Sequence, residues 1–149
     1  MTTLTHVNHR GEAAMVDISE KGECQREALA YGFIQLQPET LNLIRENLVK
    51  KGDVYAVARV AAIQAIKRTW ELIPLCHHIP LSAIEVDFDE LENGVECSVK
   101  VKAFASTGVE MEALNGVQVS LLTIYDMCKA VDKQMVISNV HLVHKSKSQ

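Results

Sequence analysis

The chain has 149 residues, of which 48% are hydrophobic, and this is enough for one domain with a full core. A net charge of -4 and the lack of any block of basic residues argue against partners such as nucleic acid or a membrane surface. No apolar run has membrane length, and the N-terminal residues lack the apolar core of a signal peptide. We therefore expect a single domain, residues 1–149, that works in the cytoplasm, where four scattered cysteines stay reduced.

Two strands are predicted near the N-terminus. Residues 13–18 have the pattern of a short strand, although Asp17 within it also fits a turn or a helix cap. Residues 26–36, beginning at Arg26, form a strand in their second half, where Gly32 indicates a bulge or a close backbone approach.

Two helices are predicted next. Pro38 begins the first, whose apolar face holds Leu41, Ile44 and Leu48. Asp53 is a good N-cap for the second, an alanine-rich stretch that runs to residue 70. Lys51 lies just before this second helix. It is either a solvated loop lysine or part of an anion site, because helix N-termini attract anions.

An apolar loop bracketed by Pro74 and Pro80 follows, and it carries Cys76, His77 and His78. Proline fixes the backbone, so the loop is a shaped connector rather than a strand. A histidine in such a loop can transfer protons near neutral pH, contact phosphate, or simply pack. No second Cys/His cluster lies at zinc spacing, so we expect no metal site.

A hairpin and a long helix come next. Residues 83–91 and 95–101 alternate apolar and polar residues on either side of Asn93-Gly94, the strongest short-range hairpin signal. Residues 107–131 then show helical periodicity, and Thr107 with Glu110 has the pattern of a capping box at a start near Gly108. The buried stripe is predicted to hold Leu114, Val117, Leu121, Ile124, Cys128 and Val131.

Asp126 and Lys129 lie three residues apart near the end of this helix, so their side chains are neighbours and form at least a surface ion pair. A last strand is predicted at residues 135–143, and the final six residues are expected to fray. Strands punctuated by a few helices indicate an α+β fold, and we predict a ferredoxin-like sandwich with helices on one face of a mainly antiparallel sheet.

Five short motifs taken together resemble one family. They are M-V-D-I-S at 15–19, K-G-D-V at 51–54, K-R-T-W-E-L-I-P-L-C-H at 67–77, G-V-E-M-E-A-L at 108–114 and L-T-I-Y-D-M-C-K-A at 122–130. In this combination and order the chain resembles the cyclic pyranopterin monophosphate synthases, the accessory protein C family of molybdenum cofactor biosynthesis. The resemblance covers nearly the whole chain.

The resemblance implies a lyase that rearranges 3′,8-cyclo-7,8-dihydroguanosine 5′-triphosphate into cyclic pyranopterin monophosphate and releases pyrophosphate. It implies that Asp126 is the catalytic acid/base with Lys129 as its partner, and that Lys51 and His77 serve the phosphates and proton transfers. Substrate would be bound by Leu75, Cys76, His77, Met111 and Glu112, with Glu110, Arg26 and Asp17 as weaker candidates. No cofactor is firmly implied, although Mg²⁺ can accompany the triphosphate.

The chain departs from the family pattern in two places. His78 follows His77 where the family has a proline, and the C-terminal tail, which includes Lys145, lacks the family's glycines. Two other functions are open to the same residues: a ligand-binding regulatory oligomer without catalysis, and a metal-dependent hydrolase that uses Cys76, His77 and His78 as ligands.

A small nucleotide is too short to reach both ends of the long helix. Glu112 and Asp126 are fourteen residues apart on it, which is roughly 21 Å at 1.5 Å per residue. We therefore predict an active site shared between two subunits, in which one subunit's Glu112 meets the other's Asp126 and Lys129 across a two-fold axis. The family resemblance independently implies a homohexamer built as three dimers.

Overall fold

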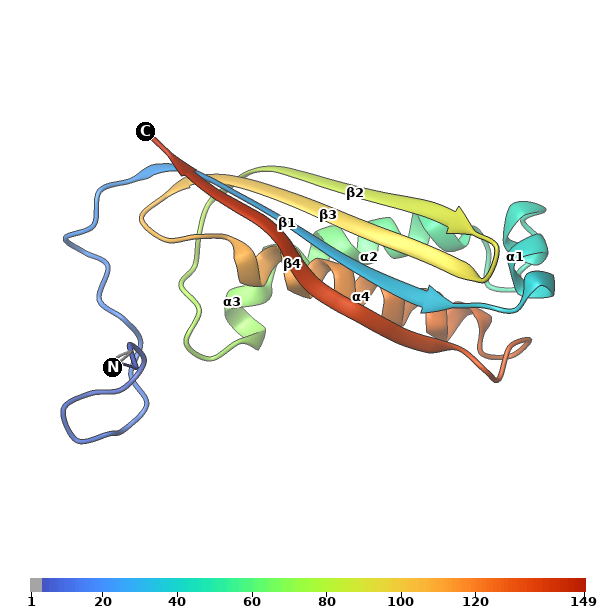
Figure 1. Cartoon of the computed structure of the whole chain (residues 1–149), viewed down its shortest axis with the longest axis horizontal. Helices are drawn as coiled ribbons and strands as arrows, with labels where there is room; N and C mark the ends of the chain where they lie inside the picture. Colours follow the sequence, from blue (N-terminus) through green and yellow to red (C-terminus); the bar gives the residue numbers. More distant parts are fainter. Residues whose placement is uncertain (1–3) are drawn as a thin grey trace.

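The computed structural model describes residues 4–149. Along the chain lie β1 (Cys24–Gln35), α1 (Pro38–Arg45), α2 (Val54–Lys67), α3 (Thr69–Leu72), β2 (Leu81–Leu91), β3 (Gly94–Ala105), α4 (Glu110–Cys128) and β4 (Val136–Ser148). The four strands form one antiparallel sheet in the order β2-β3-β1-β4 (Figure 1). The predicted α+β sandwich is confirmed, and its chain order is that of the ferredoxin-like fold.

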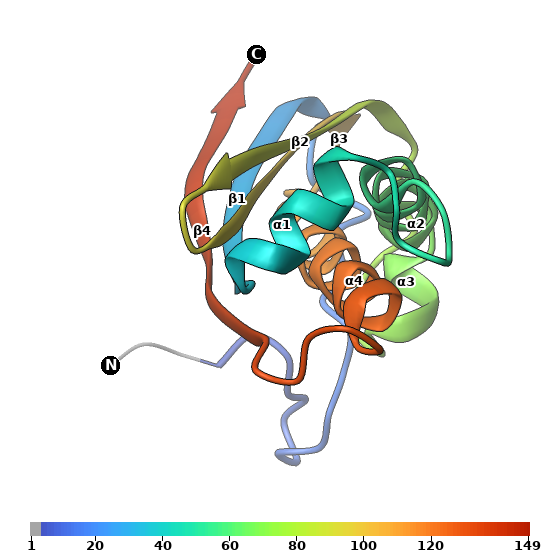
Figure 2. The same ribbon diagram turned by 90° about the vertical axis from the view of Figure 1, so that its right-hand side faces the viewer.

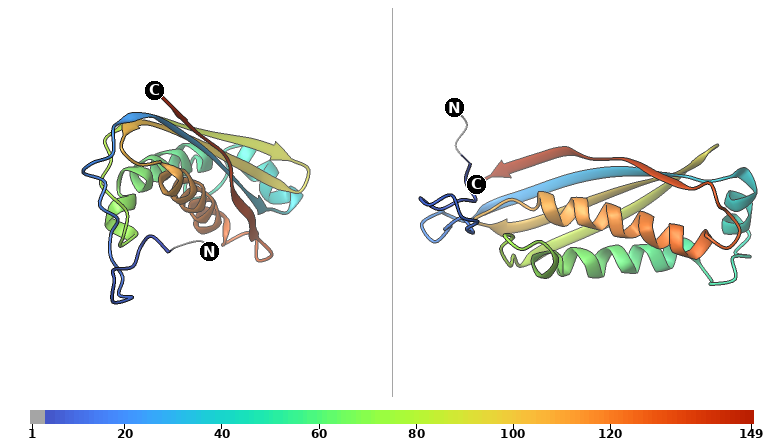
Figure 3. Two further views of the ribbon diagram at one scale, coloured as in Figure 1. Left: turned by 60° about the vertical axis from the view of Figure 1, so that its left-hand side comes forward. Right: turned by 90° about the horizontal axis from the view of Figure 1, so that it is seen from below.

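The helices cover one face of the sheet. Figures 2 and 3 show α2 and α4 lying side by side beneath it. Alternate residues of β1 and β3 point towards these helices, since successive side chains of a strand face opposite ways. The inward residues of the two strands are small or β-branched and fully buried, among them Ala28, Ala30, Val99 and Val101. Because most of the helix-facing residues of α2 are alanines, that helix packs close to α4.

Gly32 lies where β1 passes closest to α4. A Cβ atom there would lie 2.6 Å from Val117 Cγ1 and 2.8 Å from a methyl of Leu121. The pairing of β1 with β4 also shifts register between Tyr31 and Phe33. Both interpretations of this glycine, as a bulge and as a close approach, are confirmed.

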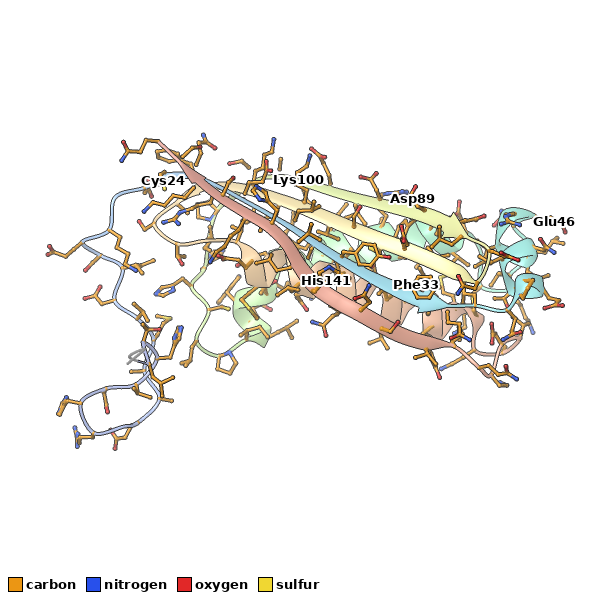
Figure 4. All side chains as sticks on the ribbon, viewed as in Figure 1. Cys24, Phe33, Glu46, Asp89, Lys100 and His141 are labelled. Carbon is orange, nitrogen blue, oxygen red and sulfur yellow. The ribbon has the colours of Figure 1, made fainter. Side chains whose placement is uncertain are left out.

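The opposite face of the sheet is open in the protomer. Figure 4 labels Phe33, Asp89, Lys100 and His141, which lie on strand positions that alternate with the core positions. Lys100 pairs with Glu85 on the neighbouring strand at 3.0 Å. This face is therefore amphipathic and tied by cross-strand ion pairs.

Helix α4 is continuous over its 19 residues and runs from one end of the sheet to the other (Figures 1 and 3). Gly116 does not break it. A Cβ at Gly116 would lie 2.6 Å from Ile66 Cδ1, so this glycine serves the contact between α4 and α2. No helix between residues 4 and 149 is long and apolar enough to span a membrane.

Several predicted boundaries are wrong. Residues 13–18 form no strand, because no strand lies beside them; their one ladder contact is an isolated bridge between Val7 and Ala13. The C-terminal residues do not fray, because β4 pairs with β1 as far as Ser148. The alanine-rich helix ends at Lys67, and α3 follows as a separate turn.

The capping box is also wrong. Helix α4 begins at Glu110 with Val109 as its N-cap, and no side chain caps it. Glu110 instead pairs with Lys145 of β4, with Nζ 3.1 Å from the carboxylate.

Two residues predicted on the apolar faces of helices are exposed. Val131 and Leu48 each lie beyond the end of their helix, whereas the remaining predicted stripe residues of α4 are buried or half-buried.

Candidate active site

A cavity of about 310 Å³ opens at the start of α4. Three segments distant in sequence form its wall: the N-terminal segment, the loop between α3 and β2, and the first turn of α4. The predicted residues among its lining are Leu75, Cys76, His77, Glu110, Met111 and Glu112. The structure therefore brings together six residues that the motifs had placed in two separate stretches of sequence.

Glu112 is the buried acid of this cavity. Its side chain belongs to the first turn of α4, and the residue is only 5% exposed. Burial raises the pKa of Glu112 to about 7, and the neighbouring carboxylate of Glu110 adds to the rise. A carboxyl group with this pKa can both donate and accept a proton near neutral pH.

The proline-bracketed loop is held in shape by contacts on both sides. His77 Nε2 lies 2.7 Å from the backbone carbonyl of Val16, so the ring fastens the N-terminal segment to the loop. His78 turns outward and stacks on Trp70, with ring centroids 4.6 Å apart. Burial raises the pKa of the Cys76 thiol, and the charge of Glu112 adds to that effect.

Asn115 links α4 to the junction of α2 and α3, from which this loop continues. Its amide donates to the carbonyl of Ala65 at 3.0 Å and to the hydroxyl of Thr69 at 3.1 Å. These groups lie where α2 ends and α3 begins, so the side chain satisfies a carbonyl at the end of α2. The loop that follows is thereby held at a fixed place relative to Glu112.

The opposite end of α4 carries a second charged group. Lys51 Nζ lies 2.9 Å from Asp126 Oδ2 and 3.0 Å from the Asp126 carbonyl, and Lys129 Nζ lies 2.9 Å from Asp126 Oδ1. The predicted pair of Asp126 and Lys129 is confirmed, and Lys51 joins it from the loop before α2. Hydrogen bonds from Lys129 and then Lys51 lower the pKa of Asp126 below its ordinary value.

Within one protomer the two groups do not meet. The cavity lies at the start of α4, where Glu112 is, whereas Asp126 belongs to the last turn of the same helix, and Figures 1 and 3 show the two ends of α4 far apart. Fourteen residues of unbroken helix separate Glu112 from Asp126, a distance of roughly 21 Å. Each protomer therefore holds two separate halves of the predicted set of residues.

Of the three weaker candidates, Glu110 lines the cavity, whereas Asp17 and Arg26 do not. Asp17 makes a turn, accepting hydrogen bonds from the amide and hydroxyl of Ser19. Arg26 is half-buried and its guanidinium donates to the carbonyls of Ala105 and Ser106 at 3.4 and 3.1 Å. Asp17 thus has the turn role that its sequence context also allowed.

Sequence reasoning missed several residues of the cavity wall. Val16, Ile18 and Lys21 contribute from the N-terminal segment, and Thr107 contributes from the loop before α4. Ser106 donates its hydroxyl to the carbonyl of Lys21 at 2.8 Å, which fixes the end of that segment. A lone lysine in a polar stretch has no spacing signal, so Lys21 could not be found without the fold.

The histidines and cysteines do not gather. All four cysteines of residues 4–149 are free thiols. Over the same residues, no group of three or more histidine, cysteine, aspartate or glutamate side chains is placed to hold a metal ion. Cys76 and His77 face the cavity while His78 stacks outward, so the ligand set of the hydrolase alternative is not assembled in the protomer.

Fold and site together fit one class: an α+β protein with groups suited to binding a small anionic molecule and moving protons on it. A carboxylate between two lysines and a buried acid that titrates near neutral pH are the groups such chemistry requires. The MoaC family model matches residues 15–148, and the chain belongs to this family. The cyclic pyranopterin monophosphate synthase of Thermomicrobium roseum (strain ATCC 27502 / DSM 5159 / P-2) is 53% identical over 148 residues, which cover 98% of this chain and 89% of that protein.

Proposed function

We propose that the chain converts 3′,8-cyclo-7,8-dihydroguanosine 5′-triphosphate into cyclic pyranopterin monophosphate and pyrophosphate, a lyase reaction of molybdenum cofactor biosynthesis. The family membership and the 53% identical relative, which is a cyclic pyranopterin monophosphate synthase, support the proposal. The observation that carries it is the pair of acid/base groups on α4, one buried and one held between two lysines. We assign the reaction to the cytoplasm.

The ionisable groups of the site match the two parts of the reaction, which are the rearrangement of the rings and the formation of the cyclic phosphate. Opening a purine ring and rebuilding it as a pterin requires repeated proton transfers, which Asp126, Glu112 and His77 can carry. Closing a cyclic phosphate and expelling pyrophosphate places negative charge on the departing oxygens, which Lys51 and Lys129 can stabilise. Both lysines are already held against one carboxylate, so little reorganisation is needed on substrate binding.

We assign the remaining predicted residues to substrate binding. Leu75, Cys76 and Met111 form the side of the cavity that receives the flat bicyclic part of the substrate. Glu110 is neutralised by Lys145 and so presents less negative charge to the phosphates than a free carboxylate. Arg26 and Asp17 contribute to substrate binding indirectly, because their hydrogen bonds shape the backbone beside the cavity.

The active site is completed between two subunits in this proposal. A dimer whose α4 helices run antiparallel across a two-fold axis places one subunit's cavity opposite the other's Asp126 group, and it creates two equivalent sites. The continuous helix supports this arrangement, because neither half can reach the other within a protomer. Three such dimers would form the homohexamer.

The proposal includes no resident cofactor. The two lysines provide the positive charge that a metal would otherwise bring to the departing phosphate. Mg²⁺ enters only as a counter-ion of the triphosphate. Metal analysis of the purified protein tests this point, and a stoichiometric bound metal would favour the hydrolase alternative instead.

The direct experiment is incubation of the purified chain with the cyclised GTP substrate, with detection of both cyclic pyranopterin and pyrophosphate. Equal amounts of the two products are expected. Asp126→Asn serves as the matched control, because it keeps the size of the side chain and removes its charge. Tight binding of the substrate without either product would favour the regulatory oligomer.

A further inference from the structure

Asp132 is a buried carboxylate that the proposed reaction does not use. It is 3% exposed and lies in the connection between α4 and β4. Oδ2 accepts from the Gln37 amide and the Thr40 hydroxyl, each at 2.9 Å, and Oδ1 accepts from the Gln134 amide at 3.0 Å. Burial alone would raise the pKa of Asp132, but these hydrogen bonds outweigh it and the pKa is lowered.

The carboxylate joins two segments that are far apart in sequence. On one side, the Asp132 amide donates to the Cys128 carbonyl at 3.0 Å, so the residue ends the turn that follows α4 and contains Lys129. On the other side, Gln37 is the N-cap of α1, and its own side chain caps nothing. Asp132 supplies a side-chain acceptor that this helix start lacks, and its charge adds to that of Glu39 in the first turn.

This junction is connected through the chain to both lysines of the pair. Helix α1 leads through the following loop to Lys51, and α4 ends next to Lys129. The side chains of Lys51, Asp126 and Lys129 are 48%, 55% and 58% exposed. Exposed ion pairs are weak and do not order a backbone by themselves. The order of the group must therefore come from the elements that carry it, which are α2 packed against α4 and the Asp132 junction between α4 and α1.

We propose that Asp132 is a positioning residue, which fastens the end of α4 to the start of α1 and so holds Lys129, and through α1 the loop of Lys51, against Asp126. The role in turnover rests on the proposed function, whereas the fastening itself does not. Small displacements of catalytic groups are costly, since about 1 Å of misplacement can lower a rate by roughly 10².

Asp132→Asn tests the proposal, because it keeps the size of the side chain, removes the charge and turns an N–H towards existing donors. We expect kcat to fall by about tenfold or more with a much smaller change in KM.

Thr40→Val removes one of the donors without adding charge, and kcat is expected to fall by about threefold. Asp89→Asn, an exposed carboxylate on the open face of the sheet, is the matched control and should leave kcat unchanged.

A double-mutant cycle with Lys129→Ala separates positioning from general stability. If Asp132 acts through Lys129, Asp132→Asn causes little further loss once Lys129 is gone. An equal fall in both backgrounds, or an unchanged kcat in the single variant, would overturn the proposal. If Asp132→Asn does not fold, Thr40→Val is carried through the same cycle.

Amide hydrogen exchange gives a readout that does not depend on activity. Asp132→Asn should speed exchange in residues 126–133 by about tenfold and leave residues 110–117 unchanged, because only the fastened end of α4 is released. Equal acceleration at both ends would mean global destabilisation and would overturn the proposal. Absence of turnover in the unmodified chain would defeat the proposed function alone, and the exchange result would still decide whether Asp132 fastens this end.

Discussion

The start of α4 buries a carboxyl group, whereas the end of α4 exposes one. Glu112 lies in a cavity wall, where burial raises its pKa to about 7. Asp126 lies at the surface, where two lysines lower its pKa. Opposite shifts on one helix allow two acids of similar chemistry to take different roles at the same pH, one protonated and one ionised.

The difference also sets opposite effects of pH on stability. Glu112 ordinarily titrates near 4.5, so between that pH and about 7 the unfolded chain releases a proton that the folded chain keeps. The unfolded state binds fewer protons there, and the free energy of unfolding falls as pH rises. Asp126 behaves in the opposite sense: its ion pairs stabilise the fold above its ordinary pKa of 3.8, and this contribution is lost as pH falls below that value.

Removing a lysine at the exposed end should have the largest effect. Lys51→Ala and Lys129→Ala each take away one charge contact to the transition state, which typically costs on the order of 10²–10³ in kcat. The free energy of unfolding should change little, because these ion pairs are exposed.

Steady-state kinetics at saturating substrate, with chemical denaturation of the same samples, measures both quantities. Lys67→Ala serves as a control, since Lys67 is an exposed lysine at the end of α2. Turnover at the unmodified rate by either lysine variant would show that the exposed end of α4 is not catalytic.

At the buried end, Glu112→Gln should remove a pH dependence. The unmodified chain is expected to lose on the order of 3 kcal/mol of stability between pH 4.5 and 7.5, as an upper limit for a shift of this size. The glutamine amide of the variant cannot ionise, so its thermal or urea unfolding should follow a flatter curve over that interval.

Glu110→Gln is the matched carboxylate control for this measurement. It should retain most of the pH dependence, because Glu110 contributes less to the raised pKa of Glu112 than burial does. Parallel curves for the unmodified chain and Glu112→Gln would mean that Glu112 is not held protonated in the folded state.

The smallest predicted effect concerns the loop beside the cavity. His78→Ala removes the stack on Trp70 and should lower stability by about 0.5–1.5 kcal/mol. Trp70→Ala should lower stability by a similar amount through the same contact. The double variant should lose less stability than the sum of the two single losses, because both single variants break the same stack. His144→Ala, an exposed histidine of β4, is the control. Additive losses for His78 and Trp70 would show that the stack does not hold the loop.

Much of the difference between the two ends of α4 could be predicted from the sequence. The spacing of Asp126 and Lys129 on a helix predicts their ion pair, and the alternation of residues 83–101 predicts the hairpin, because both patterns act over a few residues. The spacing of fourteen positions from Glu112 to Asp126 predicts that the two acids lie at opposite ends of the helix.

The remainder depends on contacts between distant parts of the chain. Lys51 meets Asp126 across 75 residues, which no local pattern encodes. The polar tail at residues 144–149 resembles a frayed end, yet β1 offers it an unpaired edge and it becomes the end of β4. The capping box fails because α4 begins at Glu110 with Val109 as its N-cap, so Thr107 lies before the helix start. The first two errors have one cause: a distant segment provided a better partner than the neighbouring residues.

Subunit complementation tests the shared site most directly. Glu112→Ala and Asp126→Ala proteins, each inactive alone, are mixed in equal amounts with exchange of subunits confirmed by two affinity tags. In a two-fold dimer, half of the mixed population pairs one of each, and one of its two sites then holds both native groups, so about a quarter of the original activity should return. If exchange is complete and no activity returns, the two ends of α4 do not form one site between subunits.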